Sequence, residues 1–425
     1  MGLVGIASDA YTLNITINCY SHLNQMGYAL SVSAHFFKLG LQTDNATSNT
    51  LINGFVLRNR VADAARVFRK MMVGGYCQPD AITFNTLIKG YCAMGNNTAA
   101  IQLLRHMEAN GCQPDVFTFN TIIDSLGKDT LVDEALNLSS EMVGIGIVPD
   151  VITYNSLIQG VCNIRRWKEA WRLLNEMASQ GIFPNVITFT ILVDALCKDG
   201  RGKRIDKAYK IFKEMPHRGI VPNTITYNTL INGFCKAGRL QEAEKLFYEM
   251  QDCGQLPSVL TYAVILDALC SNQQLSKAIE LLREMKDKKL ELNIVVYTII
   301  IEGLCKAGKL DSAVEVFSCL SSNGVQPNVM SYTVMIQGFC KGGLLSEAKK
   351  LLRAMEEKGC PPNGCTYNII IRGLLNNNDA SRAMRLIQEM VESGFSADAS
   401  TMELIFGLLC KDVVDPALLP LLKRP

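Results

Sequence analysis

The chain has 425 residues, of which 48% are hydrophobic, and its formal net charge is +2. Such a weak charge does not by itself indicate nucleic-acid binding, so a basic surface would have to come from the placement of lysines and arginines. No apolar run approaches 18 residues without polar interruptions, which argues against a transmembrane helix.

A repeat of 35 residues runs along the chain. The segments 81–90, 151–160, 224–233 and 329–338 are near copies of one another, and each follows a proline and a small polar residue. A fixed period of this size is typical of a solenoid, in which each unit buries its apolar face only against its neighbours. We predict a truncated repeat over 1–9, a partial C-terminal repeat and tail over 399–425, and between them eleven units, numbered here 1 to 11: 10–44, 45–80, 81–115, 116–150, 151–185, 186–223, 224–258, 259–293, 294–328, 329–363 and 364–398.

Each unit has the apolar spacing of two helices. In unit 7 the apolar residues of 225–235 and of 243–250 each recur on one helical face, on either side of a turn. Position 20 is alanine in all eleven units, which predicts close approach of two helix backbones, and position 27 is methionine in nine, which predicts core packing. Position 31 is glycine in ten units, with Lys289 the exception, as expected where a left-handed residue ends a helix. We therefore expect an all-α fold, an α-solenoid of about eleven 35-residue helix-turn-helix repeats that form a right-handed superhelix.

The fifteen cysteines follow the same period. The spacing favours core packing over a metal site, and many reduced thiols favour a non-secretory compartment. Eight cysteines fall at position 12, where we expect one buried stripe: Cys92, Cys162, Cys197, Cys235, Cys270, Cys305, Cys340 and Cys410.

The units resemble the pentatricopeptide repeat. The resemblance is clearest in TITYNTLINGFCKAGRLQEAEKLFYEMQDCGQLPS (224–258) and in 293–328, and it covers the chain from residue 10 to about 411. A tetratricopeptide array, the nearest alternative, has a 34-residue period and a tryptophan-containing signature that is missing here. The uniform units are similar to the P class of plant organelle proteins, and residues 11–44 to its restorer-of-fertility-like subgroup.

This resemblance implies sequence-specific binding of single-stranded RNA, one base per repeat, in organelle RNA processing, stability or translation. Positions 5 and 35 would choose the base, and uracil would be preferred by the pairs Asn14/Asp44, Asn49/Asp80, Asn85/Asp115, Asn120/Asp150 and Asn368/Asp398. Cytosine would be preferred by Asn155/Asn185, which leans partly to uracil, and by Asn228/Ser258; adenine would be preferred by Thr190/Asn223, Thr298/Asn328 and Thr333/Asn363. Ala263/Asn293 departs from the family pattern, because alanine has no polar group to read a base edge. With the N-terminus toward the 5′ end, the implied target is about UUUUCACNAAU.

The chemistry of these residues supports the same interpretation. Positions 5 and 35 are expected to be exposed on one rim of the solenoid, where an asparagine amide offers a donor and an acceptor and a shorter threonine leaves room for a purine. An asparagine at a helix start is also an ordinary capping residue, which stays an alternative for any single position. In the family, position 2 sandwiches the base, and apolar groups on a rim suit base faces unless they pack against the neighbouring repeat: Tyr11, Ile82, Phe117, Ile152, Ile187, Ile225, Leu260, Val295 and Met330.

Lysine recurs at position 13, where we expect the first helix to end. A cation there suits the helix dipole, and it would equally suit a phosphate contact on a basic inner face. The candidates are Lys128, Lys198, Lys236, Lys306 and Lys341, with Lys411 in the partial repeat.

No catalytic pattern accompanies the repeats. The four histidines occupy unrelated positions and no deaminase pattern follows the repeats, so we expect no enzyme, no cofactor and no metal. We expect a monomer whose partner is single-stranded organelle RNA, with a recruited nuclease or other processing factor and no membrane. The alternative is a protein-interaction solenoid of the tetratricopeptide kind. We expect a mitochondrial location, with the chloroplast as the alternative, and a transit peptide upstream of Met1.

Overall fold

The computed structural model describes residues 9–38, 44–74, 78–199 and 202–409, and within these ranges all regular structure is helical. The chain divides into two compact parts, each described by itself: a first part of Met1–Asp199 with Lys207–Val221, and a second part of Gly200–Asp206 with Pro222–Pro425. None of the described helices has the length and apolar character needed to cross a membrane.

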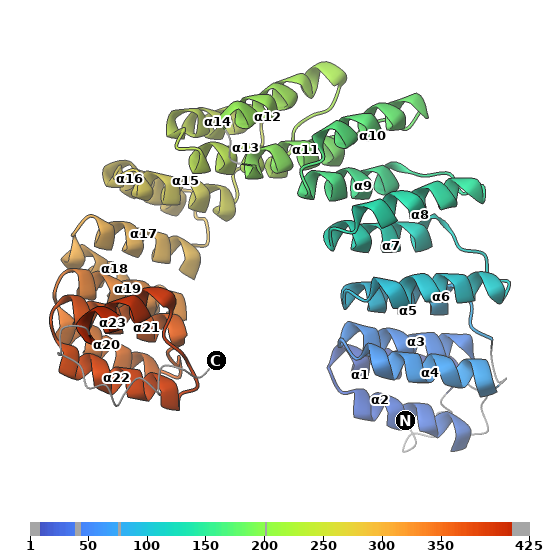
Figure 1. Cartoon of the computed structure of the whole chain (residues 1–425), viewed down its shortest axis with the longest axis horizontal. Helices are drawn as coiled ribbons and strands as arrows, with labels where there is room; N and C mark the ends of the chain where they lie inside the picture. Colours follow the sequence, from blue (N-terminus) through green and yellow to red (C-terminus); the bar gives the residue numbers. More distant parts are fainter. Residues whose placement is uncertain (1–8, 39–43, 75–77, 200–201, 410–425) are drawn as a thin grey trace. The chain divides into compact units, whose positions relative to one another are not determined.

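The helices follow one another in pairs, the first helix of each unit having an odd number and the second an even number (Figure 1). A 3-10 helix, Pro216–Arg218, follows α12. In chain order the α-helices are α1 (Ala10–His22), α2 (Met26–Lys38), α3 (Asn45–Leu57), α4 (Val61–Gly74), α5 (Ala81–Ala93), α6 (Asn97–Ala109), α7 (Val116–Lys128), α8 (Val132–Gly144), α9 (Val151–Asn163), α10 (Trp167–Ser179), α11 (Val186–Lys198), α12 (Gly202–Glu214), α13 (Thr224–Lys236), α14 (Leu240–Asp252), α15 (Val259–Ser271), α16 (Leu275–Asp287), α17 (Ile294–Lys306), α18 (Leu310–Ser322), α19 (Val329–Lys341), α20 (Leu345–Glu357), α21 (Gly364–Asn376), α22 (Ala380–Glu392) and α23 (Ala399–Leu409).

The helices of each part pack in two layers. In the first part α5 contacts α7 and α7 contacts α9, whereas α6 contacts α5 of its own unit and α7 of the next. The second part repeats this arrangement, with α15, α17 and α19 in contact in that order. The first helices thus form one layer that presents equivalent positions one unit apart, which confirms the predicted all-α solenoid.

The first helices begin at a capping residue. Asp115 has an extended backbone, and its Oδ1 accepts a hydrogen bond from Thr118 N at 2.9 Å. Ser258 caps α15 in the same way, with Thr261 N at 3.3 Å. Loss of such a cap costs about 1 kcal/mol. The cap is position 35 of the preceding unit, which accounts for the restriction of this position to Asp, Asn and Ser.

A left-handed residue follows the second helices, as the glycines at position 31 predict. Gly181 has a φ of 73°, and Lys289, which replaces glycine in unit 8, adopts the same conformation with a φ of 54°. The backbone therefore requires this conformation even where the sequence lacks the residue that favours it.

The core lies at the positions that the period predicts. All eleven alanines at position 20 expose at most 2% of their surface, and the nine methionines at position 27 are also buried. Position 12 of one unit packs against position 10 of the next. A Cβ added to Gly338 would lie 2.5 Å from Cys305 Sγ, and one added to Gly303 would lie 2.5 Å from Cys270 Sγ. Glycine at position 10 thus lets neighbouring first helices approach closely.

The predicted cysteine stripe occupies this contact. Burial raises the pKa of the Cys162 thiol to about 12 and that of Cys340 to about 11, so these thiols stay protonated at neutral pH. No group of three or more His, Cys, Asp or Glu side chains in the described ranges could hold a metal ion. Among the cysteines at position 12, Cys410 lies outside the described residues, Cys92, Cys235 and Cys305 are half-buried, and Cys162, Cys197, Cys270 and Cys340 are buried.

Candidate nucleic-acid interface

In units 2 and 4, positions 5 and 35 meet beside the start of the next first helix. Asn49 Nδ2 donates to Asp80 Oδ1 at 3.1 Å, and Asn120 Nδ2 donates to Asp150 Oδ1 at 3.0 Å. The capping aspartate is therefore shared between the helix that it starts and the asparagine of the unit that it ends.

A threonine at position 3 of the following unit completes each of these pairs, a contact that the sequence did not predict. Thr153 Oγ1 donates to Asn120 Oδ1 at 2.6 Å and lies 3.0 Å from Asp150 Oδ1. The hydroxyl fixes the amide with its oxygen inward and its nitrogen toward the aspartate. Position 3 is threonine or serine in most units, but this recurrence is equally typical of a capping box and so does not by itself indicate the contact with asparagine. The same contact recurs at Thr83–Asn49 (2.6 Å), Thr118–Asn85 (2.7 Å) and Thr188–Asn155 (2.7 Å).

One carboxylate oxygen of these aspartates is left over. Every hydrogen bond that the Asp80 carboxylate accepts within the described chain reaches Oδ1, and the same is true of the Asp150 carboxylate. Desolvation by partial burial opposes ionisation, but the hydrogen bonds from Thr153 and Asn120 prevail and lower the pKa of Asp150. At neutral pH, Oδ2 of each aspartate is thus an anionic acceptor with no partner in the described chain.

Two units that lack an asparagine at position 5 are arranged differently. Thr298 Oγ1 donates a hydrogen bond to Ile294 O at 2.7 Å, within its own helix. The hydroxyl oxygen can then act only as an acceptor toward other groups. Ala263 is buried, and the residue at position 3 of the following unit is Val296, also buried, in place of the usual threonine. Where position 5 has no polar group, the hydroxyl that would bind it is absent as well.

Asn228 in unit 7 lacks the threonine contact. Its Oδ1 is buried and has no hydrogen-bond partner in the described chain. Thr261, at position 3 of unit 8, pairs with the cap instead, since its hydroxyl lies 3.1 Å from Ser258 Oγ. The Asn228/Ser258 pair thus presents a different set of polar groups from the Asn/Asp pairs of units 2 and 4, and Asn14 Oδ1 in unit 1 likewise has no hydrogen-bond partner in the described chain.

The expectation that position 5 is exposed is wrong for several units. Thr333 exposes only 4% of its surface; its hydroxyl donates to Val329 O at 2.7 Å and lies 2.9 Å from Thr366 Oγ1. The physical reason is that the next first helix packs against the side chain, as the contact with Thr366 shows. Five other residues at this position are also buried: Asn120, Asn155, Ala263, Thr298 and Asn368.

In units 8, 9 and 10 position 35 is exposed while position 5 is buried. The expectation that both positions of a unit are exposed together is therefore wrong for these three units, and also for unit 11, where Asp398 is exposed and Asn368 is buried. In unit 9 Asn328 Oδ1 accepts from Ser331 N at 2.9 Å as the cap of α19, and it makes no hydrogen bond with Thr298 within the described chain. The reason is that position 5 bonds inside its own helix or, in unit 8, has no polar group, so the cap is left alone at the surface. The exposed caps of the three units are Asn293 on α17, Asn328 on α19 and Asn363 on α21.

The apolar residues at position 2 lie on the surface. Each exposes more than half of its surface, which is unusual for large apolar groups and disfavours the alternative that they pack against the neighbouring repeat. The residues are Tyr11, Ile82, Phe117, Ile152, Ile187, Ile225, Leu260, Val295 and Met330.

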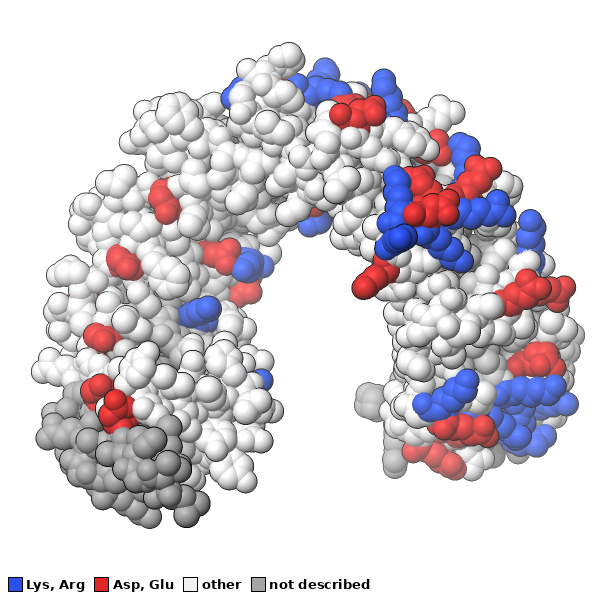
Figure 2. Space-filling view, turned by 180° about the vertical axis from the view of Figure 1, so that it is seen from behind, with Lys and Arg blue, Asp and Glu red and all other residues white. Residues whose placement is uncertain are grey.

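The lysines at position 13 fall into two groups. Lys128 pairs with Asp124 at 2.6 Å, and Lys198 and Lys306 pair in the same way with an acidic residue four positions earlier, Asp194 at 2.6 Å and Glu302 at 2.8 Å. Lys236 and Lys341 make no ion pair within the described chain, where position 9 is an amide residue. Lys411 lies outside the described residues. Figure 2 likewise shows lysine and arginine interspersed with acidic residues on the described face that it draws.

All three groups of residues meet in one groove, which we call the central groove. It has a volume of about 1160 Å³ and runs over α5, α7 and α9. Phe117 and Ile152 from position 2, Asn120 and Asp150 from the selecting pair, and Lys128 from position 13 all line it. An apolar surface, a polar pair and a cation within one groove suit a nucleotide's base face, base edge and phosphate. The exposed caps of units 8 to 10 belong to the second part of the chain and do not line this groove: Asn293, Asn328 and Asn363.

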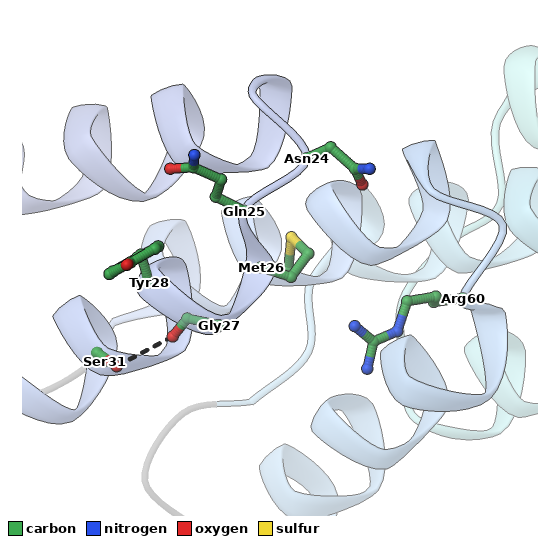
Figure 3. A pocket seen from close by; sticks show the side chains of 7 residues that line it. All are labelled: Asn24, Gln25, Met26, Gly27, Tyr28, Ser31 and Arg60. Atoms are coloured by element: carbon green, nitrogen blue, oxygen red, sulfur yellow. Dashed lines mark hydrogen bonds between the residues drawn. The ribbon is translucent and has the colours of Figure 1, made fainter.

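A second hollow lies at the turn between α1 and α2 and has a volume of about 520 Å³ (Figure 3). Met26, Tyr28 and Arg60 line it, and Ser31 Oγ donates to Gly27 O at 3.0 Å within α2. No residue of position 2, 5, 13 or 35 contributes to this hollow, so it is separate from the candidate interface.

Comparison with known proteins decides the family. Sequence profiles described as "PPR repeat family" match residues 79–128, 114–163, 149–198, 200–236, 222–271, 257–306, 292–341, 327–376 and 363–411, and the PPR repeat profile matches 46–76. The chain belongs to the PPR repeat family. PPR denotes the pentatricopeptide repeat, so the resemblance inferred from the sequence is confirmed.

Relatives in Arabidopsis thaliana match short segments of this PPR chain. One pentatricopeptide repeat-containing protein, named mitochondrial, is 34% identical over 94 residues, which are 22% of this chain and 21% of that protein. A second, a putative protein also named mitochondrial, is 45% identical over 62 residues, or 15% and 10% of the two chains. A third, named chloroplastic, is 28% identical over 107 residues, or 25% and 14%. The matches thus span about a fifth or less of these relatives' length.

Among solved structures, the pentatricopeptide repeat protein PPR10 in complex with an 18-nucleotide psaJ RNA element has the same fold. It aligns with a TM-score of 0.73 at 24% identity, over 95% of this chain and 58% of that one. PPR10 from maize aligns with a TM-score of 0.53 at 24% identity, over 97% and 68%. These likenesses establish the PPR solenoid fold of this chain.

Proposed function

We propose that this PPR chain binds single-stranded RNA, one base per repeat, along the layer of first helices. The single observation that carries the proposal is the central groove, where a position-2 side chain, a position-5/position-35 pair and a position-13 lysine lie together. PPR10, which shares the fold, was solved with RNA bound. In each unit the base would lie against the exposed residue at position 2, with its edge toward the selecting pair.

The hydrogen-bond pattern of the Asn/Asp pairs favours uracil. Asp150 Oδ2 is an anionic acceptor with no partner in the described chain and suits the N3–H of uracil, whereas cytosine presents an acceptor at the same place. Asn120 Nδ2 keeps a second hydrogen for a carbonyl oxygen of the base. An amide at position 35 can donate instead, as in Asn155/Asn185, which favours cytosine in part.

Threonine at position 5 favours adenine for two reasons. The threonine side chain is shorter than that of asparagine. The Thr298 hydroxyl donates its hydrogen bond to Ile294 O, so the hydroxyl oxygen is left as an acceptor that suits the amino group of adenine. The exposed amide of Asn328, which does not bond to Thr298, would meet the base separately. With these pairs in chain order, the proposed target is UUUUCACN followed by AA, and the family code places uracil at the eleventh base.

The biological setting of the proposal is an organelle. Relatives named mitochondrial and chloroplastic support an organellar location, and the P-class, restorer-like resemblance favours the mitochondrion. The chain would act by occupancy, as a monomer, protecting RNA or marking a site for a recruited nuclease or other processing factor.

Binding of labelled UUUUCACNAAU in competition with a scrambled RNA of the same composition tests the proposal. We expect the designed sequence to bind more tightly by about 1–3 kcal/mol for each well-read base. Equal affinity for both RNAs would argue against base reading, and no binding of either RNA would favour the alternative, a protein-interaction solenoid.

A further inference from the structure

The selecting pair of unit 11 is built differently from the other Asn/Asp pairs. Asn368 is 3% exposed, and its Nδ2 donates to Gly364 O at 2.7 Å and to Ser396 O at 3.3 Å. Its Oδ1 accepts from the backbone N of Asp398 at 2.9 Å. The amide thus has both of its hydrogens and its oxygen engaged inside the protein, whereas Asn120 directs its nitrogen to Asp150.

An arginine also forms an ion pair with the carboxylate of this pair. Arg372 Nη1 lies 2.8 Å from Asp398 Oδ1 and 2.6 Å from Oδ2. In unit 4, within the described chain, Asp150 makes no ion pair and its Oδ2 accepts no hydrogen bond. Asp398 therefore lacks the unpartnered acceptor that would read uracil.

The arginine accounts for the inward amide as well. In unit 2 the backbone N of Asp80 donates to Thr83 Oγ1 at 3.2 Å, and that hydroxyl donates to Asn49 Oδ1. In unit 11 the corresponding hydroxyl, Thr401 Oγ1, accepts from Arg372 Nη1 at 3.1 Å, and the N–H of Asp398 goes to the asparagine instead. One guanidinium thus rearranges all three members of the group.

Arg372 stands at position 9, where the other units carry no arginine. Position 9 is Asn53 in unit 2 and Asp124 in unit 4. The only other cation there is Lys89 in unit 3, and it makes no ion pair with Asp115 within the described chain. The guanidinium of Arg372 is permanently charged, and its Nη1 alone contacts both carboxylate oxygens of Asp398.

We propose that Arg372 is a specificity-determining residue that withdraws Asp398 from base selection, so that unit 11 accepts the eleventh nucleotide without choosing its base. This inference rests on the proposed function of the other units. Selection then ends at the tenth base, and the target is UUUUCACNAAN.

Competition binding with four RNAs that differ only at base eleven tests the inference. For the wild-type chain we expect the four affinities to agree within about twofold, while a change of uracil to cytosine at base four costs about tenfold. Arg372→Asn restores the residue found in unit 2 and should create a preference of about tenfold for uracil at base eleven, with base four unchanged. Thermal unfolding checks that the variant is folded.

The reciprocal exchange is made in unit 2. Asn53 is exposed, and Asn53→Arg should reduce the uracil preference at base two to about twofold or less, whereas Asn53→Gln should retain it. A wild-type preference for uracil at base eleven as strong as at base four would overturn the inference, as would full retention of the base-two preference in Asn53→Arg. Loss of discrimination at base four in the wild-type chain would instead refute the proposed function, so the two failures are distinguishable.

Discussion

Thr153 Oγ1 donates a hydrogen bond of 2.6 Å to Asn120 Oδ1, across 33 positions of sequence, and so links the selecting asparagine of one repeat to the first helix of the next. Thr153 is fully buried and cannot touch a base itself. Its role is to set the direction of the amide, which leaves the nitrogen and the neighbouring carboxylate as the groups that can face RNA.

Thr153→Val should therefore weaken base reading more than it weakens binding. The substitution keeps the shape but leaves Asn120 Oδ1 without its donor, at a cost of about 1–3 kcal/mol in the free energy of unfolding. We expect the uracil preference at base four to fall several-fold, with the other bases read as before, in competition binding. Thr121→Val is the matched control, because within the described chain that hydroxyl bonds only Phe117 O of its own helix. Equal effects of the two variants on base four would contradict the positioning role.

Unit 8 offers the converse change. Ala263→Asn alone would bury an amide opposite the apolar Val296 and should destabilise the chain by about 1–3 kcal/mol. Adding Val296→Thr supplies the missing hydroxyl and should recover most of this loss in a thermal-unfolding double-mutant cycle. The double variant should also acquire a pyrimidine preference at the eighth base. Additive free energies would show that the two positions do not interact.

The contact between Cys305 and Gly338 predicts a second coupling. Gly338→Ala places a methyl group 2.5 Å from Cys305 Sγ and should lower the free energy of unfolding by about 1–3 kcal/mol. Cys305→Ala removes the sulfur, so the double variant should be more stable than the sum of the single changes predicts. Denaturant unfolding of the four proteins measures the coupling, and its absence would mean that the helices shift apart freely.

Phosphate contacts should differ between the two groups of lysines. Lys236→Ala should flatten the log–log salt dependence of RNA binding by about 0.7 and weaken all sequences alike. Asp124→Asn frees Lys128 from its ion pair and should steepen the salt dependence of RNA binding by a similar amount. Unit 7 already has this combination, with Asn232 four positions before Lys236. Because the Lys128–Asp124 pair is exposed, stability should change by less than about 1 kcal/mol. If neither variant changes the salt dependence of RNA binding, the lysines at position 13 do not contact phosphates.

The sequence predicted the helical pairs, the buried Ala and Met positions, the left-handed stop and the exposed residues at position 2, because each depends on a local pattern repeated many times; of the cysteine stripe, four described members are buried and three are half-buried. It did not predict the threonine contact, since Thr153 and Asn120 come together only when two units stack. The burial of Thr333, beside an exposed Asn363 in the same unit, was missed for the same reason. Arg372 was not singled out at all, because a single departure at position 9 carries no periodic signal.

The most direct test of the central claim is the base preference of the Asp150→Asn variant. Asparagine keeps the cap, as Asn185 and Asn223 do in this chain, but replaces the anionic acceptor by an amide. The account predicts that the preference for uracil over cytosine is lost or reversed at base four alone, by about 1–3 kcal/mol, while the preferences at bases three and six stay as in the wild-type chain. An unchanged preference at base four, or an equal loss of affinity for every RNA, would contradict it.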